Sequence, residues 1–140
     1  MIEQLTVFLE NKKGRLASLC RALADANISM RALTIADTER YGVVRIITDQ
    51  PHLGQQTLSE QGFRATLASV LAVEVPDVAG GLATLLETFE TFDVNIEYAY
   101  CFASHDGKAI DVLRVDDEEL AITAVNAIGY RVLTAEELYG

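Results

Sequence analysis

Side chains that could perform catalytic or metal chemistry are few and scattered in this sequence. His52 falls at the start of a predicted helix and His105 at the tip of a predicted hairpin, and neither has a partner at a spacing typical of a metal site or an activated nucleophile. Cys20 and Cys101 are isolated, without a CxxC pair, and we expect both to be buried small apolar residues. No phosphate-binding loop, nucleophile elbow or calcium loop occurs. The sequence therefore predicts no catalytic residue, no metal and no cofactor.

A turn that occurs twice is more informative. Residues 10–16 and 76–82 share the order Asn or Asp, two residues, Gly, any residue, Leu, and the Gly lies where a helix is predicted to begin. Free backbone N–H groups at a helix start favour a carboxylate by about 0.3–1 kcal/mol, and glycine lets a ligand approach the main chain closely. A small anionic group could bind there. The other interpretation is helix capping by Asn11 or Asp77, which needs no ligand.

Both turns belong to an internal repeat. At an offset of 66 residues the chain aligns with itself for more than thirty positions without a gap. Equivalent apolar positions include Leu5, Val7 and Leu9 in one copy and Leu71, Val73 and Val75 in the other. One extra residue in the second predicted hairpin then raises the offset to 67. A repeat of fixed period indicates one structural unit used twice, so a groove between the copies is a natural place for function.

Hydrophobic periodicity predicts the same six elements in each copy. Alternating apolar residues indicate strands, and the i, i+3, i+4, i+7 spacing indicates amphipathic helices. In the first copy we expect a strand over 2–9, a helix between Gly14 and Asn27, strands over 28–36 and 43–48 joined by the hairpin 38–42, a helix from Pro51 to Gly62, and a last strand from Phe63. In the second copy the ranges are 70–75, 82–92, 94–103, 109–115, 118–128 and 130–133, with the acids 116–119 as helix caps.

This βαββαβ order predicts an α+β fold of two ferredoxin-like units, each an antiparallel four-stranded sheet with both helices on one face. We expect one domain over residues 1–68 and a second over residues 69–140, with scarcely room for a linker between them. Side-by-side packing of the units would remove exposed edge strands and is the geometry we expect. Back-to-back packing of the open faces is the alternative.

Aromatic residues recur at every second position in part of the strand over 94–103. Tyr98, Tyr100 and Phe102 alternate along it, and we place them on the face of Val94 and Ile96, in the core or at an interface.

Composition excludes some classes of function. Half of the 140 residues are hydrophobic and 23 % are charged, which is typical of a globular chain. The formal net charge of −10 disfavours binding of nucleic acid or anionic lipid by a basic surface. No apolar run approaches the ~20 residues of a membrane span, and the first residues do not form a signal peptide. We expect a cytoplasmic protein.

The repeated turn, together with the strand starts Asn27-Ile28-Ser29-Met30 and Asp93-Val94-Asn95-Ile96, resembles the regulatory ACT domain. The pattern of that family runs approximately D-x-P-G-x-L, then an amphipathic helix, then G-[IV]-N-I. The match covers both copies and nearly the whole chain. It departs from the pattern at Lys13 and Ala79, which replace the Pro, at Asn11, which replaces the Asp, and at Ser29, which replaces the strand Asn.

The resemblance implies ferredoxin-like units that associate side by side and bind amino acids or related effectors between the first turn of one unit and the second-strand start of its neighbour. Carried over residue by residue, it implies two ligand-binding pockets. In the first pocket, Asn11, Lys12, Gly14, Arg15 and Leu16 would face Asn95 and Ile96. In the second, Asp77, Gly80, Gly81 and Leu82 would face Ser29 and Met30. The first combines a basic turn with an amide that can accept an ammonium group, so we expect it to be the stronger site.

Three hypotheses of function follow. The first is a non-enzymatic sensor that binds an amino acid or a similar zwitterion between its copies and regulates a client enzyme of amino-acid metabolism, as a homodimer or otherwise. The second is a permanent regulatory subunit of a biosynthetic enzyme, of the acetohydroxyacid synthase type. The third, a small ferredoxin-like enzyme, lacks a nucleophile–base pair or metal set in the sequence.

Overall fold

The computed structural model describes residues 1–37 and 40–139, with the backbone alone described for residues 103–105. The chain forms two compact units. The first unit comprises Glu3–Ala68 with Tyr139, and the second comprises Met1–Ile2 with Ser69–Leu138. Thr38 and Glu39 of the predicted hairpin lie outside the described residues.

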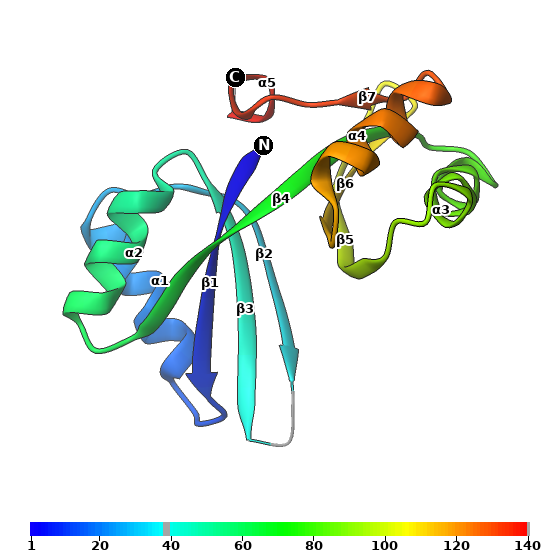
Figure 1. Cartoon of the computed structure of the whole chain (residues 1–140). Coiled ribbons are helices and arrows are strands. Elements are labelled where there is room, and N and C mark those ends of the chain that lie inside the picture. The colour runs from blue at the N-terminus through cyan, green and yellow to red at the C-terminus, as the bar shows by residue number, and fades with distance from the viewer. Residues whose placement is uncertain (38–39, 140) are drawn as a thin grey trace. The chain divides into compact units, whose positions relative to one another are not determined.

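The first unit has the predicted βαββαβ order. Its elements are β1 (Ile2–Glu10), α1 (Arg15–Asp25), β2 (Met30–Asp37), β3 (Tyr41–Thr48), α2 (Pro51–Glu60) and the first residues of β4 (Arg64–Pro76). The strands lie in the order β2-β3-β1-β4, and β3 is antiparallel to both β1 and β2. Both helices cover one face of this sheet (Figure 1). Leu5, Val7 and Leu9 of β1 are buried under them with Leu19 and Leu23 of α1.

The second unit repeats this arrangement. The rest of β4 is followed by α3 (Gly81–Thr91), β5 (Ile96–His105), β6 (Lys108–Val115), α4 (Glu118–Ala127), β7 (Arg131–Val132) and α5 (Ala135–Tyr139). The strand order β7-β4-β6-β5 matches that of the first unit element by element. The predicted fold of two ferredoxin-like units is thus confirmed, whereas their side-by-side packing stays a prediction. None of the described helices is long and apolar enough to cross a membrane.

One strand replaces two predicted ones. The sequence predicted a strand from Phe63, a short connection through residues 67–69, and a new strand from Val70. In the structure β4 runs without interruption from Arg64 to Pro76. The connection over residues 67–69 has the sequence Leu-Ala-Ser. It includes neither Gly nor Pro, the residues that most often end a strand. At the other end, β7 has only 2 residues instead of the predicted four, and α5 was not predicted.

Some side chains of β5 also lie on a different face of the sheet from the predicted one. Ile96 pairs with Val115 of β6, but a bulge follows, and Tyr98 pairs with Arg114. The irregularity shifts the alternation of side chains, so Tyr98 and Tyr100 lie on the face opposite Ile96 rather than beside it. The prediction that Tyr98 and Tyr100 share a face with Ile96 was therefore wrong.

The two cysteines have different environments. Cys20 is partly buried against the core of the first unit, as predicted, and Cys101 on β5 is exposed, which the prediction had wrong. Cys101 lies on β5, the edge strand of its sheet, where it pairs with Asp111 of β6.

An acidic side chain occupies a core position of the second unit. Asp111 lies opposite Val73 in the ladder of β4 and β6 and is only 5 % exposed. The equivalent pair of the first unit is Val7 with Val44, and Val44 is fully buried. Among the side chains that the structure describes, none makes a hydrogen bond or an ion pair with the Asp111 carboxyl. Burial raises the pKa of this carboxyl above its ordinary value of 3.8.

We predict that Asp111→Val, which installs the residue of the first copy, stabilises the protein by about 1–3 kcal/mol at neutral pH. Since the pKa of Asp111 is raised in the folded state, its ionisation destabilises that state as the pH rises above the ordinary carboxyl pKa. The gap between wild type and variant should therefore widen with rising pH through that range. Urea unfolding of both proteins across the range measures the gap, and a gap that is zero or independent of pH would contradict the prediction.

Candidate functional site

The turn between β1 and α1 has a defined geometry. The Arg15 N–H donates to the Lys12 carbonyl at 3.3 Å, which closes a four-residue turn. Gly14, its third residue, has φ 88° and ψ −9°, the left-handed conformation that the third position of a type II turn requires. Lys13 occupies the second position, where proline is common. Gly14 is also the N-cap of α1.

The turn between β4 and α3 repeats this geometry closely. The Gly81 N–H donates to the Val78 carbonyl at 3.0 Å, and Gly80 has φ 87° and ψ −8°. Ala79 takes the second position. The predicted equivalence of the two turns is therefore confirmed in backbone conformation.

Both helix starts are open. In both helices the N-cap residue is the glycine, Gly14 or Gly80, rather than Asn11 or Asp77, and it makes no side-chain cap hydrogen bond. Leu16 and Leu82 are the second residues of their helices, so their N–H groups have no carbonyl partner within the helix. By contrast, Asp117 caps α4 by accepting from the Leu120 N–H at 3.0 Å, as predicted for this acidic run. Such uncapped helix starts can receive an anion.

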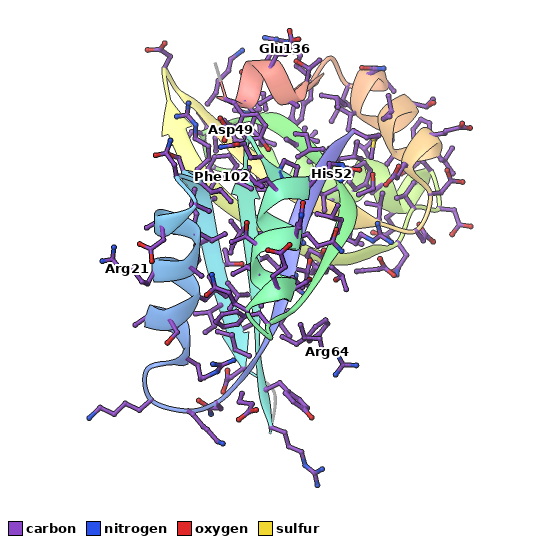
Figure 2. All side chains as sticks on the ribbon, turned by 90° about the vertical axis from the view of Figure 1, so that its left-hand side faces the viewer. Arg21, Asp49, His52, Arg64, Phe102 and Glu136 are labelled. Carbon is purple, nitrogen blue, oxygen red and sulfur yellow. The ribbon has the colours of Figure 1, made fainter. Side chains whose placement is uncertain are left out.

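Positive charge is held close to the first turn. The Arg15 guanidinium lies over the Phe63 ring at 4.6 Å, and its Nε is buried with no hydrogen-bond partner among the described residues. Lys12 Nζ lies 2.9 Å from Glu10 Oε2, and this hydrogen bond and charge lower the pKa of the exposed Glu10 carboxyl. Figure 2 shows Arg21, another basic residue of this unit, extending outward from α1. The first turn thus contains three basic residues of its own, Lys12, Lys13 and Arg15.

The second turn lacks such charge. Gly81 stands where the first copy has Arg15, and a Cβ at Gly81 would overlap the carbonyl oxygen of Pro76. The Tyr130 hydroxyl, equivalent to the Phe63 ring edge, donates to the Gly81 carbonyl at 2.9 Å. Exposed Asp77 adds a negative charge. Residues 76–82 thus include no basic side chain, and Lys108, which pairs with Pro76, forms an ion pair with Glu74. The first turn has three basic side chains within it, Lys12, Lys13 and Arg15.

Two hydrogen bonds link the start of β5 to Asp116. The Asn95 N–H donates to Asp116 Oδ1 at 2.9 Å, and the Asp116 N–H donates to the Asn95 carbonyl at 3.1 Å. These bonds use the backbone of Asn95 and leave its exposed side-chain amide available to a ligand. In the first unit the corresponding Ser29 precedes β2, and its carbonyl accepts from Thr48 Oγ1 at 2.7 Å.

A groove of about 370 Å³ lies at this strand start, wholly within the second unit. It brings Asn95 and Ile96 together with four residues that sequence reasoning missed. Its lining consists of Leu86, Glu90, Asp93, Val94, Asn95 and Ile96. Leu86 and Glu90 are four residues apart on α3, so helical spacing could have indicated that they share the side of the helix next to the strand.

The other residues that the sequence singled out do not line the groove at the start of β5. His52 lies at the first turn of α2 (Figure 2). Its side chain is 74 % exposed and pairs with Glu3. No group of three His, Cys, Asp or Glu side chains suited to a metal ion occurs within the part of the chain that the structure describes. Met30 and Leu82 are exposed at their strand and helix starts. The pairing of the first turn with Asn95, and of the second with Ser29, stays a prediction.

The turn geometry predicts opposite effects at neighbouring positions. Ala79→Pro should stabilise the protein by about 0.4–1 kcal/mol, because proline fits the second position of a type II turn and no backbone acceptor among the described residues receives the Ala79 N–H. Gly80→Ala should cost about 1–2 kcal/mol, since φ is 87° although nothing lies within 4 Å of the added Cβ. Chemical denaturation measures both changes; a neutral Gly80→Ala would show that the turn tolerates a right-handed conformation.

Solved structures share this fold. Protein BT0572 from Bacteroides thetaiotaomicron is similar with a TM-score of 0.91 and 33 % sequence identity, over 99 % of this chain and 95 % of that one. The regulatory subunit of aspartate kinase from Thermus thermophilus, in a ligand-free form, has a TM-score of 0.68 and 16 % identity, over 91 % of this chain and 92 % of that one. The regulatory subunit from Thermus flavus has a TM-score of 0.62 and 19 % identity, over 89 % and 90 %. Because the two Thermus proteins are only 16 % and 19 % identical to this chain, their similarity shows the fold alone.

Among curated proteins none matches this sequence. The family described as ACT domain pair matches residues 1–137, nearly the whole chain, and its paired architecture agrees with the two βαββαβ units and their two glycine turns. The protein therefore belongs to the ACT domain pair family.

Proposed function

We propose that this protein is a regulatory module that binds an amino acid. The carboxylate of the ligand binds the open N–H groups at the start of α1, next to Arg15, and its ammonium binds the Asn95 amide of the other copy. The observation that carries the proposal is the uncapped helix start after left-handed Gly14, with cations held beside it. Dipole and hydrogen bonds both favour an anion at such a position.

The two predicted pockets differ in strength under this proposal. The second turn, with Asp77, Gly80, Gly81 and Leu82, has the same glycine N-cap but no basic residue of its own. Its proposed partners, Ser29 and Met30, offer a hydroxyl instead of an amide. A zwitterion should therefore bind mainly at the pocket of Asn11, Lys12, Gly14, Arg15 and Leu16 with Asn95 and Ile96.

Binding regulates a partner if the ligand has different affinities for two conformations of the protein. A coupling of about 1–3 kcal/mol between effector and client enzyme is the usual size. The likeness in fold to two regulatory subunits of aspartate kinase favours a client enzyme on a separate chain. A permanent subunit would co-purify with its enzyme at fixed stoichiometry, whereas a sensor of the first kind would bind its client only with, or only without, the effector.

A thermal-shift screen of the twenty amino acids tests the proposal. A ligand at about 100 times its dissociation constant should stabilise the native state by about 2.7 kcal/mol. We expect one amino acid, or a group with similar side chains, to raise the melting temperature. A flat screen would exclude amino-acid sensing and leave a structural adaptor.

Asn95→Ala should weaken binding of the amino acid found in that screen by about 1–3 kcal/mol, because a hydrogen bond to its ammonium is lost. Isothermal titration calorimetry measures the change. Ser29→Ala is the matched control at the equivalent position of the first copy and should have a smaller effect. An unchanged affinity of the Asn95 variant would remove this residue from the site.

A further inference from the structure

One cross-strand pair of the second unit carries two ionisable side chains. Cys101 of β5 lies directly opposite Asp111 of β6, so both side chains are on the same face of the sheet. The equivalent pair of the first unit is Ile35 of β2 with Val44 of β3, and both residues are apolar. The two copies therefore differ at both members of one contact, by a thiol and a carboxyl in place of two hydrocarbon side chains.

The Asp111 carboxyl has no counter-charge in its own unit. Asp111 is only 5 % exposed, and none of the described side chains makes a hydrogen bond or an ion pair with it. The three Lys and Arg side chains of residues 69–138 are all paired with other carboxylates, Lys108 with Glu74, Arg114 with Glu97, and Arg131 with Glu137. Because a buried carboxylate is unfavourable until it is paired, this position attracts a cation from outside the unit.

Cys101 lies on the solvent side of Asp111. β5 is the edge strand of the order β7-β4-β6-β5, and Cys101 is exposed on it. On its other side Asp111 is opposite Val73 of β4, which belongs to the buried core of the unit. Residues directly opposite one another in a sheet have Cβ atoms about 4.5–5.5 Å apart. A group attached to Cys101 Sγ therefore lies close enough to reach the Asp111 carboxyl.

A thiol beside a buried carboxylate selects among disulfides by their charge. In thiol–disulfide exchange the Cys101 thiolate attacks one sulfur of a small disulfide, and a bond forms between Sγ and that sulfur. The S–S bond of the reagent breaks, its other half leaves with the electron pair as a thiolate, and the proton of Cys101 goes to solvent. Cys101 is thereby oxidised and the leaving half is reduced. The negative charge of Asp111 attracts a cationic disulfide and repels an anionic one.

We propose that Cys101 and Asp111 form a modification site for cationic aminothiols, which arrive as their disulfides. The thiol makes the covalent bond, and the carboxylate becomes the counter-charge of the ammonium group in the product. The first copy has no such site, because Ile35 and Val44 supply neither group. The other thiol, Cys20, is partly buried against the apolar core of the first unit and serves as an internal reference. The modification does not depend on amino-acid binding.

Rates of mixed-disulfide formation at mildly alkaline pH test the proposal. The reagents are cystamine, which is cationic, bis(hydroxyethyl) disulfide, which is neutral, and dithiodiglycolate, which is anionic. Mass spectrometry of peptides measures the rates at Cys101 and Cys20 in the same sample. Relative to the neutral reagent, cystamine should react with Cys101 about threefold to thirtyfold faster in the wild type than in Asp111→Asn. Dithiodiglycolate should show the reverse order, and the ratios at Cys20 should be the same in both proteins.

Glu97→Gln is the matched control. It removes an exposed carboxylate of the same strand, one that is paired with Arg114, and it changes the net charge by the same amount as Asp111→Asn. The Glu97 variant should keep the preference of Cys101 for cystamine. An equal preference in the wild type and Asp111→Asn, an equal loss in Glu97→Gln, or no preference in the wild type would overturn the proposal.

A second measurement needs no change at Asp111 and so decides the matter even if Asp111→Asn does not fold. In a Cys20→Ala background, Cys101 is modified with cystamine or with bis(hydroxyethyl) disulfide, and the two products differ by an ammonium in place of a hydroxyl group. Because the ammonium pairs with Asp111, the aminothiol product should melt about 2–5 °C higher in scanning calorimetry. Equal melting temperatures, or a lower one for the aminothiol product, would show that the ammonium does not meet the carboxylate and would overturn the proposal.

Discussion

The left-handed glycine turn after the first strand of each copy is the constraint on which the rest of the candidate site depends. Gly14 and Gly80 hold nearly identical dihedral angles, and each serves as the N-cap of the helix that follows. A residue with a side chain at this position would strain the turn, and a Ser or Asp there would cap the helix with its own oxygen. Glycine does neither. It turns the chain and leaves the first N–H groups of the helix for something outside it.

Duplication kept this backbone while the residues around it diverged. Arg15 corresponds to Gly81, and the carbonyl of Pro76 leaves no space for a side chain at Gly81. The aromatic residue that follows the second helix contacts the same position in both copies, through the ring of Phe63 in one and the hydroxyl of Tyr130 in the other. In each copy an aromatic side chain thus contacts the start of the first helix, but only in the first copy is the contacted residue basic. The chemistry of the two turns differs for reasons of packing as well as of sequence.

Much of the fold follows from local sequence pattern, because alternation and helical spacing are properties of each segment by itself. The elements from β1 to β3 and from α3 to α4 were predicted in type and order for this reason. The bulge after Ile96 was not predicted, because an inserted residue depends on how the strand pairs with its partner. This bulge places Tyr98 on the face opposite the predicted one. The continuity of β4 was signalled by the absence of Gly and Pro at residues 67–69, but a repeat boundary was expected there. In the candidate site, the turns followed from the position of glycine, whereas Glu90 belongs to the groove only because α3 packs beside β5.

Under the proposed function, the division of charge between the copies determines what kind of effector can act. The cations lie at the turn of the first copy, and the carboxylates lie in the groove of the second. A ligand with only one charge would be attracted to one copy and would have no reason to affect the other. A zwitterion interacts with both, so its binding free energy depends on how the copies are placed, and this dependence is what differential affinity requires. Salt should weaken each end of the interaction, because the charged groups are exposed and are screened over about 10 Å at 0.1 M ionic strength.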